Sequence, residues 1–245
     1  MREIRKKLCF LLVLFIAVSH SKALPNPAML DFDIMPTWHR AVVYIQVPTR
    51  KLMDGKNRHY TEHCTAVAVQ PGPNPLYLSA WHCFEGYQEH LPITLLESRS
   101  GVATKTNLKL IAHGGTMESD WAILRPEALS IFPEEWLRIS ANSFAVGQKV
   151  QAAGYCANGI ANQSITKSGH LSRILLNDMD CSIIKTEGTI PATDCDAKKG
   201  SSGGAIVTQT KSGNIGLIGI ISKGDGATKT YFFPVKPLLD RIGHF

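Results

Sequence analysis

The sequence has few of the features that mark unusual classes of protein. Charged residues make up only 19% of its 245 residues, which is too few for a disordered and solvated chain. The 20 glycines and 13 prolines are too few for a low-complexity or fibrous protein, and we find no internal repeat. No apolar run reaches the roughly 20 residues that a membrane-spanning helix needs. Because hydrophobic residues make up 44% of the chain, it can bury one large core or two smaller ones.

The first two dozen residues have the three parts of a secretory signal peptide. Met1–Lys7 is basic, Leu8–Val18 is an unbroken apolar run, and the segment that follows has a small-x-small site ending at Ala23. This pattern predicts a signal peptide over residues 1–23, cleaved after Ala23. The apolar run is too short to span a bilayer, so we expect a secreted or periplasmic product with no stable membrane anchor. We expect residues 24–40 to be an N-terminal arm or a removed propeptide.

The formal net charge of +6 comes mostly from this leader. Residues 1–23 contribute +4, which leaves +2 on the remaining chain. A basic chain suggests nucleic acid or an acidic membrane as a partner only where the cations cluster. The one such cluster, Lys51–Arg58 with Tyr60, is interpreted as a solvated hairpin loop. We therefore expect no nucleic-acid partner.

Short runs rich in valine, isoleucine and leucine dominate the rest of the chain. Glycine, proline, asparagine and aspartate separate these runs, a pattern that predicts an all-β fold. Lys236–Ile242, with Pro237 in its first turn, is the single convincing helix. We expect two β halves, at residues 41–128 and 147–245, connected through residues 129–146.

Three short motifs carry residues suited to nucleophilic catalysis. Leu78–Cys83 ends a strand with His82, Ser119–Leu124 begins a strand after Asp120, and Gly200–Gly204 places Ser202 in a glycine-rich turn. Each motif alone is weak evidence. Their chain order of histidine, aspartate and serine is one of the known orders of the catalytic triad.

Together the motifs resemble the signatures of the chymotrypsin-like (trypsin-fold) serine proteases. Ser-Ala-Trp-His-Cys at residues 79–83 is similar to that family's T-A-A-H-C, and residues 200–204 are similar to its G-D-S-G-G. Residues 219–224 resemble the strand that lines the substrate cleft. The resemblance implies two six-stranded antiparallel β-barrels with a short C-terminal helix and an active site in the cleft between the barrels.

The resemblance also implies a secreted serine endopeptidase that works through an acyl-enzyme intermediate. Ser202 would be the nucleophile, His82 the base that takes its proton, and Asp120 the group that orients the imidazole. The backbone N–H groups of Gly200 and Ser202 would form the oxyanion hole. We expect a peptide or protein substrate, a monomer, and neither cofactor nor metal.

Cysteines beyond the leader are expected to form disulfides in an oxidising compartment. There are five: Cys64, Cys83, Cys156, Cys181 and Cys195. Neither His63-Cys64 nor His82-Cys83 has the spacing of a zinc site. The resemblance implies a Cys64–Cys83 disulfide. Cys181–Cys195 is the second expected pair, and pairing of Cys156 with either member stays open.

Two departures from the family bear on activation. Trypsin-like zymogens carry an aspartate just before the nucleophile to bind a new N-terminus, and here that position is Ser201. The pattern from Asp194 to Gly203 is closer to secreted bacterial trypsin-like and glutamyl-endopeptidase-like members. We therefore expect the oxyanion hole to form without insertion of an N-terminal amine.

Substrate preference has one directional cue. Asp196 lies six residues before Ser202, where trypsin-like enzymes keep the acid that binds lysine or arginine. A buried carboxylate there would favour a cationic side chain. Ser222, Lys223 and Gly224, on the strand that resembles the cleft wall, are the other expected substrate-binding residues.

Alternatives remain open at this stage. The enzyme could instead prefer glutamate or apolar residues, although Ala197 and Ile221 stand where glutamate-specific members usually have a hydroxyl residue and a histidine. A chain of this kind could also be an inactive homologue that acts as a secreted binding protein.

Overall fold

The computed structural model describes residues 36–72, 74–99, 102–128, 133, 135–157, 173–186, 190–210, 213–225 and 228–245. The expected signal peptide and residues 24–35 of the expected N-terminal arm lie outside these residues. Within the described ranges, no helix is long and apolar enough to cross a membrane.

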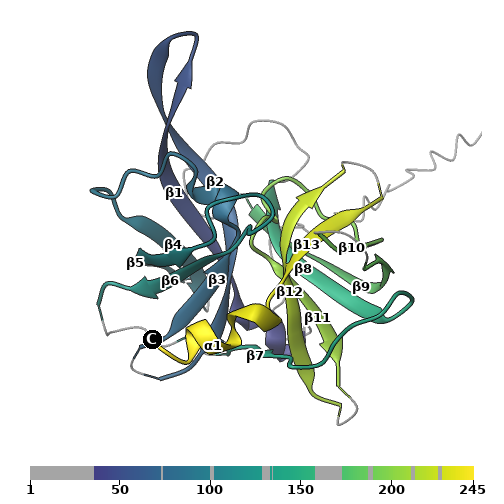
Figure 1. Cartoon of the computed structure of the whole chain (residues 1–245). Helices are drawn as coiled ribbons and strands as arrows, with labels where there is room; N and C mark the ends of the chain where they lie inside the picture. Colours follow the sequence, from purple (N-terminus) through teal and green to yellow (C-terminus); the bar gives the residue numbers. More distant parts are fainter. Residues whose placement is uncertain are drawn as a thin grey trace, which may run out of the picture. The chain divides into compact units, whose positions relative to one another are not determined.

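Six strands form the first barrel, in the spatial order β1-β2-β3-β6-β5-β4 (Figure 1). Their bounds are β1 (Val42–Met53), β2 (Lys56–Gln70), β3 (Leu76–Ser79), β4 (Ile93–Arg99), β5 (Val102–His113) and β6 (Ala122–Pro126). Neighbouring strands are antiparallel, and branched aliphatic side chains such as Ile45, Leu78 and Ile123 are fully buried. Closure of the sheet leaves this barrel without a free edge strand.

The second barrel is built from the remaining long strands. Their bounds are β8 (Lys149–Ala157), β9 (Arg173–Lys185), β10 (Ala192–Thr193), β11 (Ala205–Gln209), β12 (Ile215–Gly224) and β13 (Thr230–Pro234). These strands follow one another in the order β11-β8-β9-β10-β13-β12, and pairing of β11 with β12 closes the ring. The chain ends in a 3₁₀ turn, η3 (Lys236–Leu238), and one turn of helix, α1 (Leu239–Ile242). The predicted pair of six-stranded barrels with a short C-terminal helix is confirmed.

Two local details differ from the sequence interpretation. Lys51–Arg58 is not a loop, because β1 and β2 continue through it and only Asp54 and Gly55 form the turn. The expected connection at residues 129–146 contains a two-residue strand, β7 (Arg138–Ile139), which pairs parallel with β12 outside the second ring. A single apolar cluster includes residues of both barrels, so the barrels pack directly against each other.

Two disulfides hold the segments that approach the predicted site. Cys64–Cys83 joins β2 to the 3₁₀ turn η2 (Trp81–Phe84), and Cys181–Cys195 joins β9 to the segment before Ser202. Both pairings are those expected above, and Cys156 is buried in β8 outside them.

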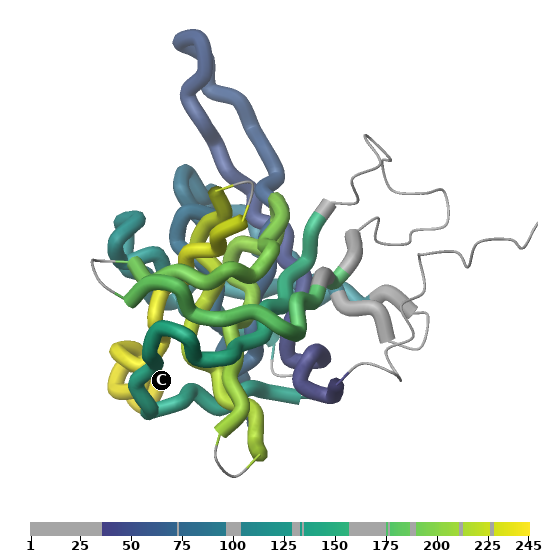
Figure 2. Tube along the Cα trace, turned by 90° about the vertical axis from the view of Figure 1, so that its right-hand side faces the viewer, coloured from purple at the N-terminus to yellow at the C-terminus, as the bar shows by residue number. Residues whose placement is uncertain are grey.

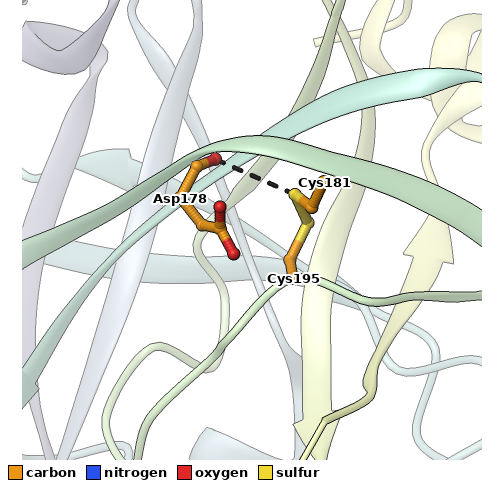
Figure 3. Close-up of side chains that lie close together, drawn as sticks. All are labelled: Asp178, Cys181 and Cys195. Atoms are coloured by element: carbon orange, nitrogen blue, oxygen red, sulfur yellow. Dashed lines mark hydrogen bonds between the residues drawn. A yellow bond between two sulfur atoms is a disulfide. The ribbon is translucent and has the colours of Figure 1, made fainter.

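A carboxylate lies beside the second disulfide. Figure 3 shows the Asp178 carbonyl facing Cys181, 3.8 Å from its sulfur. Asp178, Cys181 and Cys195 bring their side-chain ligand atoms within 4.8 Å of one another, as in a metal site. Because a cysteine binds metal as a thiolate and these two sulfurs are bonded to each other, we interpret the group as structural. Asp178 instead accepts a hydrogen bond from the Asp196 backbone N–H at 3.0 Å.

A buried histidine near the start of the first barrel predicts sensitivity to acid. His39, in the 3₁₀ turn η1 (Thr37–Ala41), is fully buried, and its Nδ1 lies 3.0 Å from the Pro36 carbonyl. Burial lowers the pKa of His39, although its hydrogen bond with the Pro36 carbonyl opposes this. The unfolded chain therefore takes up a proton first as the pH falls below about 6.5, and stability declines from there down to the folded pKa.

We therefore expect His39→Gln to reduce the pH dependence of unfolding between pH 7 and pH 5. The largest slope that one such group can cause is about 1.4 kcal/mol for each pH unit. Urea unfolding at several pH values measures the slope for both proteins. An identical slope in the variant would contradict this assignment, whatever the variant's stability at neutral pH.

Candidate active site

His82 is held in place by the strand before it and the disulfide after it. All four residues of β3 are buried, and the chain turns into η2 directly after Ala80. The neighbouring Cys83 is bonded to Cys64 on β2. The His82 side chain retains 28% exposure, so its imidazole can meet a ligand from solvent.

Asp120 lies in the loop between β5 and β6, two residues before β6 begins, and is 1% exposed. Three donors surround its carboxylate. The His82 backbone N–H donates to Oδ1 at 2.9 Å, His82 Nδ1 donates to Oδ2 at 2.9 Å, and the Ser222 hydroxyl also donates to Oδ2. These bonds compensate for the burial of the charge. Because Nδ1 carries the proton, Nε2 is left as the acceptor on the imidazole.

Ser202 completes the arrangement from the second barrel. It lies in the turn before β11, and its Oγ is 2.9 Å from His82 Nε2. The structure therefore brings together the three residues from the three separate motifs, although 120 residues separate His82 from Ser202. The hydroxyl can donate its proton to a base that is already oriented by a buried carboxylate.

The turn that carries Ser202 requires glycine after it. Gly203 has a φ of +83°, and a Cβ there would lie 2.1 Å from the Thr65 carbonyl oxygen and 2.4 Å from Ser79 Oγ. Its N–H donates to the Ile221 carbonyl at 2.7 Å. The turn thus lies tightly against β2, β3 and β12 at once.

Thr65 on β2 links the two barrels at this turn, and the sequence interpretation missed it. The Thr65 N–H donates to the Ser202 carbonyl at 2.8 Å, and its Oγ1 donates to the Gly200 carbonyl at 3.0 Å. The same Oγ1 accepts from the Tyr155 N–H at 2.9 Å. A threonine in a β run carries no signal of such a role, because the partners come from 90 and 135 residues away.

The predicted oxyanion-hole donors lie on either side of Ser201. Gly200 is buried with a φ of +101°, and Thr65 holds its carbonyl. Within the described part of the chain, neither the Gly200 nor the Ser202 N–H donates a hydrogen bond. Ser201 is 2% exposed and packs against Gly154, where a Cβ would meet its side chain at 2.8 Å.

The expected substrate-binding residues lie in different environments. Asp196 is 55% exposed and pairs with Lys198 at 2.5 Å, so it is not the buried acid on which the lysine or arginine argument depended. Ser222 is buried, and its side chain binds Asp120. Lys223 and Gly224 are exposed at the end of β12, and the Lys223 ammonium lies 5.5 Å from the Tyr231 ring centre.

We expect Gly203→Ala to destabilise the fold by at least about 3 kcal/mol, because backbone strain and overpacking add at this position. Gly147→Ala is a matched control, since Gly147 has a φ of +85° and a Cβ added there would meet nothing within 4 Å. The control should lose only about 1–2 kcal/mol. Urea unfolding of both variants measures the difference, and equal losses would show that space around Gly203 does not matter.

The chain is similar to known proteins in sequence and in fold. The family model of the trypsin-like peptidase domain matches residues 64–220. Among solved structures, the active form of the Rv3671c protease from M. tuberculosis matches with a TM-score of 0.57 and 14% identity, covering 84% of this chain and 81% of that one. The MamO protease domain from Magnetospirillum magneticum matches with a TM-score of 0.54 and 14% identity, covering 85% and 97%. At this identity the two structures support the fold alone. No curated protein matches this chain.

Proposed function

The chain belongs to the trypsin-like peptidase family, a family of serine-type hydrolases, and we propose that it is a secreted endopeptidase with His82, Asp120 and Ser202 as its catalytic residues. One observation carries the proposal: a continuous chain of hydrogen bonds runs from the Asp120 carboxylate through the His82 imidazole to Ser202 Oγ. Both links are 2.9 Å long.

This geometry supports acyl transfer in two halves. Ser202 Oγ attacks the scissile carbonyl carbon while His82 Nε2 takes the hydroxyl proton. The resulting oxyanion accepts hydrogen bonds from the Gly200 and Ser202 N–H groups. The intermediate collapses as His82 gives its proton to the leaving amine, and an ester to Ser202 remains. Water then attacks the ester with His82 as base, which releases the acid and restores the hydroxyl.

For the residue before the cleaved bond, we propose only a modest preference for lysine or arginine. Asp196, next to Ala197 in the chain, offers a negative charge to a cationic side chain of the substrate. However, the Asp196 carboxylate is exposed and is paired with Lys198. An exposed ion pair is worth at most about 1 kcal/mol, so the preference should be about fivefold or less. A digest of a peptide library measures it. Cleavage mainly after glutamate or after large apolar residues would overturn this part of the proposal.

The location of the enzyme is part of the same proposal. The leader and the two disulfides both fit a secreted or periplasmic protein, because disulfides persist in oxidising compartments. We propose that the enzyme acts there as a monomer on protein or peptide substrates.

Covalent labelling tests the proposed nucleophile. A fluorophosphonate probe should label the protein, and mass spectrometry of the digest should place the adduct on Ser202. Ser201→Ala is the matched control, because it removes the neighbouring buried hydroxyl and should keep the labelling. An unlabelled wild-type protein would contradict the proposal and favour the inactive homologue, and an adduct on another serine would contradict the assignment of Ser202 as the nucleophile.

A further inference from the structure

One hairpin of the first barrel extends beyond the barrel itself. Figures 1 and 2 show the ends of β1 and β2 projecting from the barrel as a two-stranded ribbon. β1 pairs with β4 only at residues 44–46, and β2 pairs with β3 only at residues 67–70. We call residues 50–60 the basic arm. An isolated hairpin is only marginally stable in water. The arm pairs with no other strand of the barrel, so formation of the barrel does not explain the length of the arm.

The arm concentrates positive charge. It has four cationic side chains and one acid, a net charge of +3: Arg50, Lys51, Lys56 and Arg58 against Asp54. Lys51 lies directly opposite Arg58 in the register. Like charges at such positions destabilise a hairpin. Ion pairs to Glu62 at 2.6 Å and Asp54 at 3.6 Å offset only part of that repulsion, because all four side chains are at least one-third exposed.

The tip of the arm presents apolar surface. Asp54 and Gly55 have φ values of +51° and +72°. Both are positive, as in the two-residue turn that an aspartate-glycine pair favours in hairpins. Leu52 is 72% exposed and Met53 is 46% exposed. Of the large hydrophobic residues described, none is more exposed than Leu52. The tip therefore offers two aliphatic side chains among the cations.

The base of the arm is attached to the segment that follows His82. The Arg50 N–H donates to the Gly86 carbonyl at 2.8 Å, and the Gln88 N–H donates to the Pro48 carbonyl at 3.0 Å. A Cβ on Gly86 would lie 2.3 Å from the Arg50 carbonyl oxygen, so the two segments are in close contact. The base of the arm is thus held against the segment that follows His82.

From these observations we propose that the basic arm is an exosite that binds an acidic segment of the protein substrate, with an apolar residue of that segment against Leu52 and Met53. This inference depends on the proposed peptidase function. A membrane is the less favoured partner, because even a single 14-carbon acyl chain gives only marginal membrane binding and the tip has two side chains. Attachment of the base of the arm to Gly86, four residues after His82, also favours a partner that is present during cleavage.

Two peptides with the same cleavage sequence test the proposal. In the first peptide, a glycine-serine linker joins an extension of aspartate, glutamate and leucine to the cleavage sequence, on either side of the bond that is cleaved. In the second peptide, asparagine and glutamine replace the aspartate and glutamate of the extension. At low salt we expect kcat/KM to be about tenfold higher for the acidic peptide, mainly through KM. Raising the salt concentration should reduce the advantage, because exposed charges are screened.

Arm variants identify the surface. The triple substitution Lys51→Ala, Lys56→Ala and Arg58→Ala should remove the advantage and leave kcat/KM for the neutral peptide unchanged. The matched control removes three exposed cations elsewhere, on β5 and β8: Lys105→Ala, Lys109→Ala and Lys149→Ala. The control should keep the advantage.

Other outcomes would overturn the proposal. Equal kcat/KM for the two peptides, or equal loss in both triple variants, would show that the arm does not select acidic segments. Arm-dependent sedimentation with phosphatidylserine vesicles, without any preference between the peptides, would assign the arm to a membrane instead. Fluorescence anisotropy of the labelled acidic peptide with the Ser202→Ala protein tests the arm without catalysis. If the acidic peptide binds to the Ser202→Ala protein but the wild type cleaves neither peptide, the proposed peptidase function is wrong and the proposed binding by the arm is still supported.

Discussion

Ser202→Ala is expected to lower kcat by about 10⁶-fold, the effect of removing the nucleophile of a Ser-His-Asp triad. The reason lies in the geometry: Ser202 Oγ is the atom 2.9 Å from the base, and alanine leaves His82 Nε2 with no hydroxyl to activate. The proposed oxyanion-hole donors, which remain in the variant, would support only slow attack by water. A continuous assay with a fluorogenic peptide measures kcat, and thermal unfolding checks that the variant is folded.

A second substitution tests whether the loss belongs to the triad. His82→Ala should cost about as much as Ser202→Ala, and the double variant should be little worse than either single one, because the residues act as a unit. Ser201→Ala should stay close to the wild type. A Ser202→Ala enzyme within about tenfold of wild-type kcat would require a different nucleophile.

The three residues of the proposed triad, which hydrogen bonds bring together, could be singled out from the sequence because each lies in a short motif with its own local signal. His82 follows a strand and precedes a cysteine, and Ser202 is flanked by glycines that its turn requires. Gly203 illustrates the physical reason, since its positive φ and its contact with Thr65 exclude any side chain. Residues whose local backbone is unusual can be recognised one segment at a time.

Contacts made across the fold could not be predicted in this way. Thr65 and Ser222 both lie in ordinary β runs, and their roles depend on which distant groups the barrels bring beside them. Asp196 shows that the spacing of a residue does not predict its burial. Its spacing from Ser202 suggested a pocket acid, but its environment is set by exposure and by Lys198, and spacing carries no information about either.

In the basic arm, the charged residues led to a prediction of a longer loop than the structure has. The cations of Lys51–Arg58 suggested a solvated hairpin loop of eight residues, while the Asp54-Gly55 pair between them signals a two-residue hairpin turn. Strands continue to both sides of this pair. Turn residues therefore located this element better than polarity did.

Asp120→Asn is expected to lower kcat by about 10⁴-fold while the site stays assembled. All three groups that contact the carboxylate are hydrogen-bond donors: the His82 backbone N–H, His82 Nδ1 and the Ser222 hydroxyl. An asparagine has one acceptor oxygen, so its amide must face at least one of these donors. If the amide faces Nδ1, the imidazole proton moves to Nε2, and the base can no longer accept the proton of Ser202.

Ser222→Ala is the informative companion, because it removes one of the three donors and leaves the carboxylate. We expect a loss of about tenfold, the size of a single hydrogen bond to a charged group. Steady-state kinetics of the two variants on one peptide compares them, and fluorophosphonate labelling rates give a second measure. A loss below about 100-fold in Asp120→Asn, or equal losses in both variants, would mean that the buried carboxylate does not set the tautomer of His82.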